Sequence, residues 1–291
     1  MMQALTNALI SAAGYLLVGV GFALIYRSTR FFHFAHGIVL TVGAYVTFTL
    51  KVWIGLPLWI AIIGGIVASV LLGAAMELSV YKPLRRRGAS AAILLLASLG
   101  MYVALQAVVV LVFGSGTQTF RTGDVPEGLA MLGARITWPQ ITTIMVSGTC
   151  GLLTWLLIER SRIGKMLRAV ACDCDLAQAC GVRGDWVIMV AFLLGSSIAG
   201  LAAILLAFDQ DMTPMMGFQL LLMGMIAVII GGVGNIPGTA LGAVVLGLAQ
   251  HLTAWWLSSK WQDAIVFAIL VLFLLVRPQG FLGKPLRKVV V

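Results

Sequence analysis

Charge is the scarcest property of this 291-residue sequence: only 10% of its residues are Asp, Glu, Lys or Arg, and 61% are hydrophobic. The mean hydropathy is +1.06. A soluble domain stays in solution because charged side chains make up roughly a quarter to a third of its surface. The composition therefore excludes an ordinary soluble domain and predicts an integral membrane protein.

Two kinds of energy-coupling motif are also missing. The sequence contains no phosphate-binding loop of the form G-x-x-x-x-G-K-[ST], so any nucleotide chemistry must belong to another chain. The only Asp, Glu, Lys or Arg residue that falls within a predicted span is Glu77, at the inner end of the third; it lies near Lys82 and its basic cluster, with which we expect it to pair. A proton or sodium relay needs several such groups inside the membrane, which argues against an ion-driven carrier.

Cysteine and histidine are scarce as well, and neither is arranged as a disulfide framework or a metal site. One cysteine lies in an apolar run and three lie in one polar stretch, where we expect free thiols on a reducing side: Cys150, Cys172, Cys174 and Cys180. On an Ala-rich helix, packing explains three small residues better than a metal does. His33 and His36 have no carboxylate nearby in sequence, so no metal is predicted.

What the sequence has in abundance is long uncharged apolar runs, each close to the roughly 20 residues that a helix needs to cross the hydrocarbon core. Eight of them cover residues 8–26, 31–50, 56–76, 91–113, 136–158, 186–208, 217–236 and 237–257. A ninth, 264–276, becomes long enough when it starts from Ser258 or Ser259. The pattern predicts an all-α polytopic protein with about nine transmembrane helices, in one domain over residues 1–291.

The lysines and arginines predict the orientation, because cytoplasmic loops retain positive charge. With the polar stretch 159–185 inside, alternate loops place 15 of the 19 basic residues in the cytoplasm and leave Lys51, Arg121, Arg135 and Lys260 outside. We therefore expect a multi-pass protein of the cell inner membrane with its N-terminus outside and its C-terminus in the cytoplasm. Topology and anionic membrane lipids account for the net charge of +9, so no nucleic-acid partner is needed.

The polar stretch 159–185 predicts a docking element. A helical wheel places apolar Leu167 and Val170 on one face and Lys165 and Arg168 on another, with Gly164 and Gly181 bracketing about four turns. Such a helix would lie across the membrane face and dock a soluble protein. The alternative for Arg168 and Asp175 is a solvated helix face.

Three short segments interrupt the apolar runs: 33–37, 211–217 and 231–238. The last carries no charge, and it has two interpretations. A Gly/Pro-rich break at membrane depth is typical of a transport pathway, whereas the charge pattern equally favours a plain cytoplasmic turn. The external loop 114–135 is too rich in turn residues to form a domain.

Five stretches, in order along the chain, resemble the permease subunit of branched-chain amino acid ABC importers. They comprise Tyr26, Phe34-Ala35-His36-Gly37 and Val42-Gly43-Ala44-Tyr45; Glu77 and Tyr81-Lys82-Pro83-Leu84-Arg85; Gly164, Arg168-Ala169, Asp175, Ala179 and Gly181-Val182; Gly231-Gly232-Val233-Gly234 and Pro237-Gly238; and Arg277-Pro278-Gln279-Gly280. Each match is modest alone, but five in order are specific.

The resemblance implies a type II importer-like fold, with ATP-driven alternating access as the mechanism. It also implies a second homologous permease, two ATP-binding subunits that use ATP and Mg, and an external solute-binding protein; this subunit itself would bind no cofactor and catalyse no reaction. The 159–185 stretch would then be the cytoplasmic coupling helix. The expected coupling residues are Gly164, Arg168, Ala169, Asp173, Asp175, Gly181 and Val182, and the candidate substrate-pathway residues are Phe34, His36, Gly37, Tyr45, Gly231, Gly232 and Asn235.

Departures from the family pattern bear on the solute. His33 replaces an asparagine, Ile38 stands where an acidic residue is usual, and Met223 occupies a position where lysine is frequent. Branched-chain or other neutral amino acids are the family default, with urea and short amides as alternatives. An ATP-independent channel or secondary carrier would need a filter or ion relay. An intramembrane hydrolase would need Ser196 or Ser197 paired with His251, without the usual nucleophile context.

Overall fold

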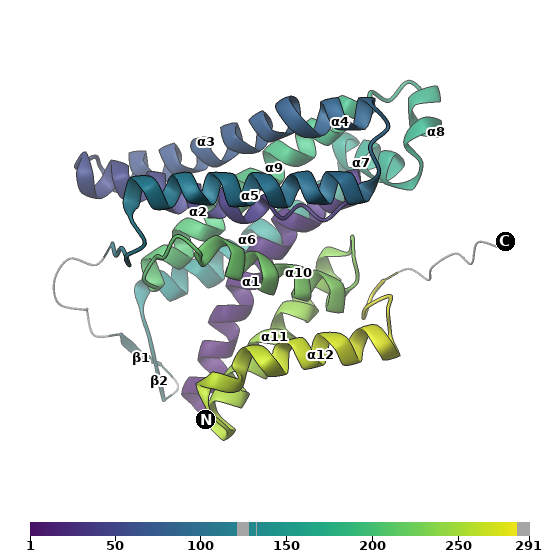
Figure 1. The fold of residues 1–291 in the computed structure, drawn as a ribbon. Helices are drawn as coiled ribbons and strands as arrows, with labels where there is room; N and C mark the ends of the chain where they lie inside the picture. Colours follow the sequence, from purple (N-terminus) through teal and green to yellow (C-terminus); the bar gives the residue numbers. More distant parts are fainter. Residues whose placement is uncertain (121–127, 132, 284–291) are drawn as a thin grey trace.

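The computed structural model describes residues 1–120, 128–131 and 133–283, and the chain there is mostly helical (Figure 1). The predicted external Arg121 and the predicted cytoplasmic Lys284, Arg287 and Lys288 lie outside these ranges. Its elements are α1 (Met2–Thr29), α2 (His36–Phe48), the π-helical turn η1 (Thr49–Trp53), α3 (Leu58–Met76), the π-helical turn η2 (Glu77–Tyr81), α4 (Lys82–Arg86), α5 (Ala91–Phe113), β1 (Leu129–Met131), β2 (Ala134–Ile136), α6 (Trp138–Arg160), α7 (Arg162–Cys172), α8 (Cys174–Ala179), α9 (Gly184–Asp209), α10 (Met216–Gly231), α11 (Ile236–Trp256), the 3₁₀ turn η3 (Ser259–Trp261) and α12 (Gln262–Val276).

Seven helical segments in the described residues are long and apolar enough to cross a membrane: Met2–Thr29, Leu58–Arg86, Ala91–Phe113, Trp138–Arg160, Gly184–Asp209, Ile236–Trp256 and Ser259–Val276. The other two apolar runs form shorter helices, α2 with its extension η1 and α10. All nine predicted runs are therefore helical, and the ninth does start at Ser259. Two of them begin or end inside the predicted limits because part of each run is a loop.

The longest peripheral segment, Leu58–Arg86, stays helical across Pro83. Proline lacks an N–H and its ring clashes with the carbonyl four residues earlier, which here belongs to Ser79. Ser79 lies within the π-helical turn η2, whose wider backbone relieves such a clash. Tyr81 and Glu77, both in this turn, are completely buried.

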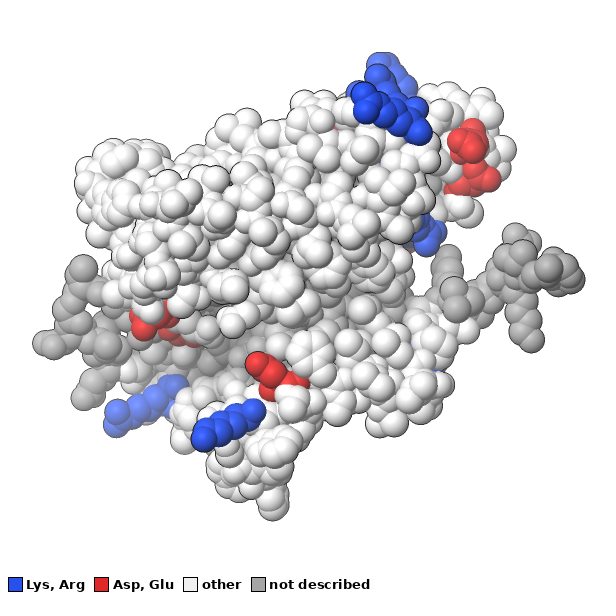
Figure 2. Space-filling view, viewed as in Figure 1, with Lys and Arg blue, Asp and Glu red and all other residues white. Residues whose placement is uncertain are grey.

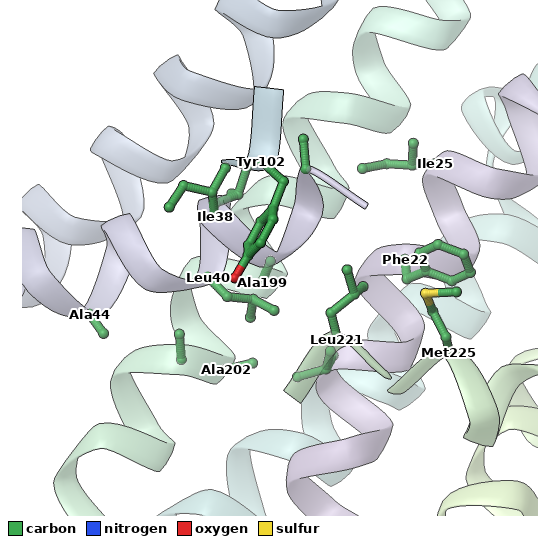
Figure 3. Close-up of a cluster of buried hydrophobic side chains, with 14 of the residues drawn as sticks. Phe22, Ile25, Ile38, Leu40, Ala44, Tyr102, Ala199, Ala202, Leu221 and Met225 are labelled. Atoms are coloured by element: carbon green, nitrogen blue, oxygen red, sulfur yellow. The ribbon is translucent and has the colours of Figure 1, made fainter. Parts of the chain in front are cut away.

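Helices α1 and α9 form the centre of the bundle. α1 contacts α6, α9, α10 and α11, and α9 also contacts α2 and α3. Side chains from five helices meet in the largest hydrophobic cluster, among them Phe22, Leu40, Tyr102, Ala199 and Leu221 (Figure 3). By contrast, most residues of α3, α5, α6 and α12 are not buried. These outer helices have the apolar, exposed surface that contact with lipid or another subunit requires.

The first and second halves of the chain share one pattern of elements. α1 ends at Thr29 and α2 begins at His36; α9 ends at Asp209 and α10 begins at Met216, so that both boundaries recur 180 residues later. α1 runs from the end that holds Arg135 to the end that holds α7, and α9 runs the opposite way. This is an inverted repeat whose two loops are 30–35 and 210–215. The first loop shortens the predicted 31–50 span, whereas the predicted 217–236 span is shortened at its other end, where α10 stops at Gly231.

Charged side chains gather at the two ends of the helices and leave an uncharged belt between them (Figure 2). Basic residues of α1, α4 and α7 share one end, because Arg30 bonds the Ala171 carbonyl of α7 and Lys82 pairs with Asp185 of α9. The opposite end carries Arg135, whose backbone bonds Gln3. The structure thus separates the two groups of basic residues as the alternating loops predict.

The 114–135 loop contains a hairpin that the turn-rich sequence did not predict. β1 and β2 pair antiparallel, with Leu129 opposite Ile136 and Ala130 opposite Arg135, across a turn in which Gly133 has a φ of 81°. Strands of three residues carry too short a pattern to read from sequence. Gln118 also bridges to Met212, which ties this loop to the end of α9.

Candidate functional site

The polar stretch 159–185 is two short helices, and not the single four-turn helix that its wheel predicted. α7 ends at Cys172 and α8 begins at Cys174, with Asp173 extended between them. One Asp173 carboxylate oxygen accepts the backbone N–H groups of Asp175 and Leu176, both at 3.0 Å. An aspartate that caps the following helix stops the preceding one, because its backbone leaves the helical region. We call residues 162–181 the docking segment.

The apolar side of the docking segment packs on its own chain. Leu167 and Val170 of α7 and Ala177 of α8 form a buried cluster with Val187 and Ala191 of α9. The predicted apolar face is thus correct for these residues. It seats the segment on the first turns of α9 and leaves the opposite side to the solvent.

The predicted coupling residues divide by exposure. Ala169, Asp173, Asp175 and Gly181 are exposed, and Val182 is half-buried. Gly164 is buried: a side chain there would collide with backbone carbonyls of α6, including that of Ile158. Arg168 turns back toward α6, where it donates to the Ile158 carbonyl and approaches the Glu159 carboxylate at 3.5 Å. Gly164 and Arg168 therefore fix the segment to α6, and the free surface comes from the other five.

Sequence reasoning missed the exposed side chain of Leu176, which lies on α8 next to Asp175. It is 63% exposed and does not belong to the buried cluster of α7, α8 and α9. A single exposed leucine is ordinary on a protein surface, so Leu176 adds an apolar contact point to the free side of the docking segment and does not mark an interface by itself. The helical wheel hid it because the wheel assumed one continuous helix through Asp173.

The docking segment is linked directly to the end of α1, and through α9 to α4. The Arg30 guanidinium, just after α1, donates to the Ala171 carbonyl at the end of α7. Asp185, in the first turn of α9, accepts from Lys82 at 3.3 Å and from Arg86 at 3.1 Å, both on α4. A displacement of α7 and α8 would thus be passed to α1, α4 and α9 together.

Glu77 pairs with the basic cluster as predicted, through Arg85 and not Lys82. The Arg85 guanidinium donates to both Glu77 carboxylate oxygens, one of them at 3.0 Å. The Glu77 side chain is fully buried and that of Arg85 is 19% exposed. A buried carboxylate is expensive unless it is paired and hydrogen-bonded in this way.

The first candidate pathway residues gather where α2 and α10 begin. Gly37 and Gly217, the second residues of the two helices, approach so closely that a Cβ on Gly37 would lie 3.3 Å from the Gly217 carbonyl oxygen. The rings of Phe34 and Phe218 stack beside them, 6.3 Å apart. Phe34, His36 and Gly37 are thus brought together at the crossing of the two half-length helices.

His33 and His36 lie in the interior of the bundle, beside this crossing. Both are completely buried, with ring centres 5.7 Å apart. The Nδ1 atom of His33 lies 3.0 Å from the Tyr81 hydroxyl, and Ser98 of α5 accepts the Ala35 N–H at 2.8 Å. Neither ring nitrogen of His36 has a hydrogen-bond partner among the residues that the structure describes. A buried polar group without a partner is costly, so His36 marks a point where an outside group could bind.

Tyr45 lies farther along α2, and its ring packs edge-on to Phe113 with centres 4.7 Å apart. Its hydroxyl is buried and has no hydrogen-bond partner in the described part of the chain. From His36 to Tyr45 the helix rises about 14 Å, at roughly 1.5 Å per residue. The two unpartnered polar groups therefore sit on one helix at different depths.

The 231–238 segment contains the short connection between α10 and α11. Asn235 caps α11 by accepting the Gly238 N–H at 3.1 Å, and its amide donates to the Leu282 carbonyl at 3.0 Å. Gly232, with a φ of 107°, packs against the backbone of Gly283. Gly231 is about 20 Å from Gly217 at the rise of an α-helix, so the structure does not join Gly231, Gly232 and Asn235 to the crossing.

His251 does not pair with Ser196 or Ser197, the two serines that the hydrolase alternative would need. The His251 Nε2 atom lies 2.8 Å from the Ser11 hydroxyl of α1, and Ser197 donates to the Leu194 carbonyl of its own helix. In the described residues no group of three or more His, Cys, Asp or Glu side chains gathers in a way that could hold a metal ion.

Comparison with known proteins agrees with this architecture. A family model described as "Branched-chain amino acid transport system / permease component" matches residues 4–274. The chain belongs to this permease family. It is 32% identical to the high-affinity branched-chain amino acid transport system permease protein BraD of Pseudomonas aeruginosa and 31% identical to LivH of Escherichia coli K12, in each case over 98% of this chain and 96% of the relative. A probable branched-chain amino acid transport permease protein LivH of Methanocaldococcus jannaschii is 26% identical over 98% of this chain and 93% of its own length.

Membership confirms the resemblance read from the sequence and identifies the chain as a multi-pass membrane permease and a transport subunit, not a catalytic enzyme. The match spans α1 through most of α12, and thus both the α2–α10 crossing and the docking segment. Both regions therefore lie in the part of the chain that matches the permease family.

Proposed function

We propose that this permease is the transmembrane subunit of an ATP-driven importer that moves branched-chain or other neutral amino acids across the inner membrane. Its relatives are named as parts of branched-chain amino acid transport systems. No phosphate-binding loop occurs in this sequence, so the motor would be two separate ATP-binding subunits that use ATP and Mg. A second homologous permease and an external solute-binding protein would complete the transporter.

The observation that carries the proposal is the docking segment. It presents an exposed side with Ala169, Asp175 and Leu176, while its buried side is fixed to α6 and α9. A rigid element that is free on one side and linked to α1, α4 and α9 on the other is suited to transmit a push from a soluble subunit. In this role the segment lies in the cytoplasm, with the N-terminus of the chain outside and its C-terminus inside.

The α2–α10 crossing supports a pathway for a small neutral solute. It brings aromatic and glycine residues together, and α2 carries buried polar atoms of His36, at the crossing, and of Tyr45, farther along, that have no hydrogen-bond partner in the described residues. An amino acid offers donors and acceptors to such atoms and an apolar side chain to Phe34 and Phe218. Urea and short amides offer the polar part alone, and remain the alternative cargo.

Uptake of labelled leucine into cells that depend on this chain tests the proposal. We expect uptake to fail when cellular ATP is depleted and to persist when an uncoupler collapses the proton gradient. Excess isoleucine or valine should compete, whereas excess urea or acetamide should not. Uptake that follows the proton gradient would indicate a secondary carrier, and competition by urea or acetamide alone would indicate the alternative cargo.

A variant separates coupling from folding. Ala169→Arg places a long cation on the exposed side of α7, where it meets no atom of this chain's buried cluster. We expect normal membrane insertion but lost leucine uptake, because the contact with the motor is disturbed. Lys260→Glu, at the opposite end of the molecule, is the matched control and should transport normally.

A further inference from the structure

A cleft of about 780 Å³ opens between the end of α4 and the start of α9, beside the docking segment. Its lining includes Arg85 and Arg86 from α4, Arg183 and Asp185 at the start of α9, and Cys174 from α8. The volume is that of a small-molecule site.

The cleft and its rim carry a surplus of positive charge. Four cations, Lys82, Arg85, Arg86 and Arg183, face two carboxylates, and one of these carboxylates, Glu77, is buried and already paired with Arg85. The other carboxylate, Asp185, is shared between two cations, Lys82 and Arg86. The N-terminus of the long helix α9 opens into the same space and adds its own partial positive charge. Charge complementarity therefore calls for an anion.

The cleft also lies at the level of a membrane interface. Leu71, Leu78, Lys82 and Arg86 follow at spacings of seven, four and four residues, which places them on one face of the continuous helix Leu58–Arg86. Leu71 and Leu78 are 64% and 54% exposed. One face is thus apolar through the membrane and cationic at its end.

Trp186, next to Asp185, marks the same depth. It is 48% exposed on the first turn of α9, and tryptophan concentrates where lipid headgroups meet the hydrocarbon core. The cationic cleft therefore opens at headgroup level, directly above an exposed apolar stripe.

We propose that this cleft binds the headgroup of an anionic phospholipid such as phosphatidylglycerol. The phosphate lies between Arg86 and Arg183, and the acyl chains descend along Leu78 and Leu71. A lipid is favoured over a soluble anion because the apolar stripe continues from the cationic pair, and over a soluble subunit because the stripe would be immersed in the membrane. The site depends on neither the proposed solute nor the proposed motor.

The test measures lipid binding to the purified full-length permease by native mass spectrometry, with dioleoylphosphatidylglycerol and dioleoylphosphatidylcholine titrated separately. We expect tighter binding of the anionic lipid. In the double variant Arg86→Gln/Arg183→Gln its affinity should fall roughly tenfold to thirtyfold, because each cation near a headgroup contributes about 1 kcal/mol. The pair Arg86→Lys/Arg183→Lys keeps the charge and should keep most of the affinity.

Three controls decide the outcome. The matched double variant Lys51→Gln/Arg135→Gln removes two exposed cations at the opposite end and should leave the affinity unchanged; an equal fall there would show general attraction and overturn the site. Displacement of the lipid by glycerol 3-phosphate would overturn it in favour of a soluble anion. Unchanged lipid affinity in Arg86→Gln/Arg183→Gln would also overturn it, and loss of a co-purifying ATP-binding subunit in that variant would then assign the cleft to that partner. Thermal unfolding of each variant reports whether it folds.

Discussion

Gly21 and Gly195 face each other where α1 crosses α9, and each has the other's carbonyl oxygen in the place of its missing side chain. A Cβ on Gly21 would lie 2.8 Å from the Gly195 oxygen, and a Cβ on Gly195 would lie 2.7 Å from the Gly21 oxygen. Ordinary contact between such atoms is about 3.5 Å. The two central helices of the inverted repeat therefore meet backbone to backbone, as small residues permit in membranes.

Gly195→Ala should destabilise the permease, because the added methyl group forces apart two helices that carry the centre of the bundle. Overpacking of this kind typically costs about 1–3 kcal/mol. The measurement is thermal unfolding of the purified permease in detergent. Gly100→Ala on α5 is the control, since a Cβ there meets nothing within 4 Å, and it should leave the unfolding temperature unchanged or slightly raised. Equal losses in both variants would mean that the crossing is not tight.

Breaking the Glu77–Arg85 ion pair should also lower the stability of the permease, because it leaves an unpaired buried charge. Arg85→Met leaves a carboxylate with a fully buried side chain and no partner for its charge. Breaking one side of a buried pair costs about 3–5 kcal/mol, and we expect about 2–4 here because Arg85 is partly exposed. The double variant Glu77→Leu/Arg85→Met should recover most of this stability, since it buries no charge. A double variant that is less stable than Arg85→Met would contradict the assignment. Thermal unfolding of the unchanged permease, of the two single variants Glu77→Leu and Arg85→Met, and of the double variant completes the cycle.

The spans could be predicted from the sequence because the bilayer offers no hydrogen bonds, so each apolar run must close its own as a helix. The errors fall at 31–35 and in the second half of the 217–236 run. The first is apolar by composition but forms a loop, since the Ala35 N–H is bonded by Ser98 of a distant helix. The second ends at Gly231, whose neighbour Gly232 packs on the chain near Gly283. A tertiary partner of this kind leaves no periodic signal in sequence.

The docking segment was located by its polarity, while its inner geometry was only partly predictable. Aspartate before a helix is an N-cap signal, so the break at Asp173 was in principle readable, but continuous amphipathicity through it concealed the break. The inward turn of Arg168 and the bridge from Asp185 to Lys82 and Arg86 depend on helices far apart in sequence. The position of the segment could therefore be predicted from the sequence, whereas these contacts could be found only in the structure.

Asp173→Ala should loosen α8 without loosening the rest of the molecule. The change removes both hydrogen bonds that start this six-residue helix, at a cost of about 1 kcal/mol. A helix this short depends strongly on its cap, because only Ala177 anchors it in the buried cluster, whereas α7 is held there by Leu167 and Val170. We expect backbone amides of residues 175–179 to exchange hydrogen about fivefold faster while the unfolding temperature stays constant. Asp175→Ala, which removes a neighbouring exposed carboxylate, should leave exchange unchanged.

The final prediction concerns orientation, on which the proposed coupling depends. Cys172 and Cys180 are exposed on the docking segment, whereas Cys150 lies half-buried in α6. If the segment faces the cytoplasm, a membrane-impermeant maleimide should leave both thiols unmodified in intact spheroplasts and modify them in inside-out vesicles. A variant with Cys172, Cys174 and Cys180 replaced by serine, and with Lys260→Cys added on η3, should show the opposite pattern. Modification of Cys172 in intact spheroplasts would place the segment outside, where no ATP-driven subunit could reach it, and the proposed importer mechanism would fail.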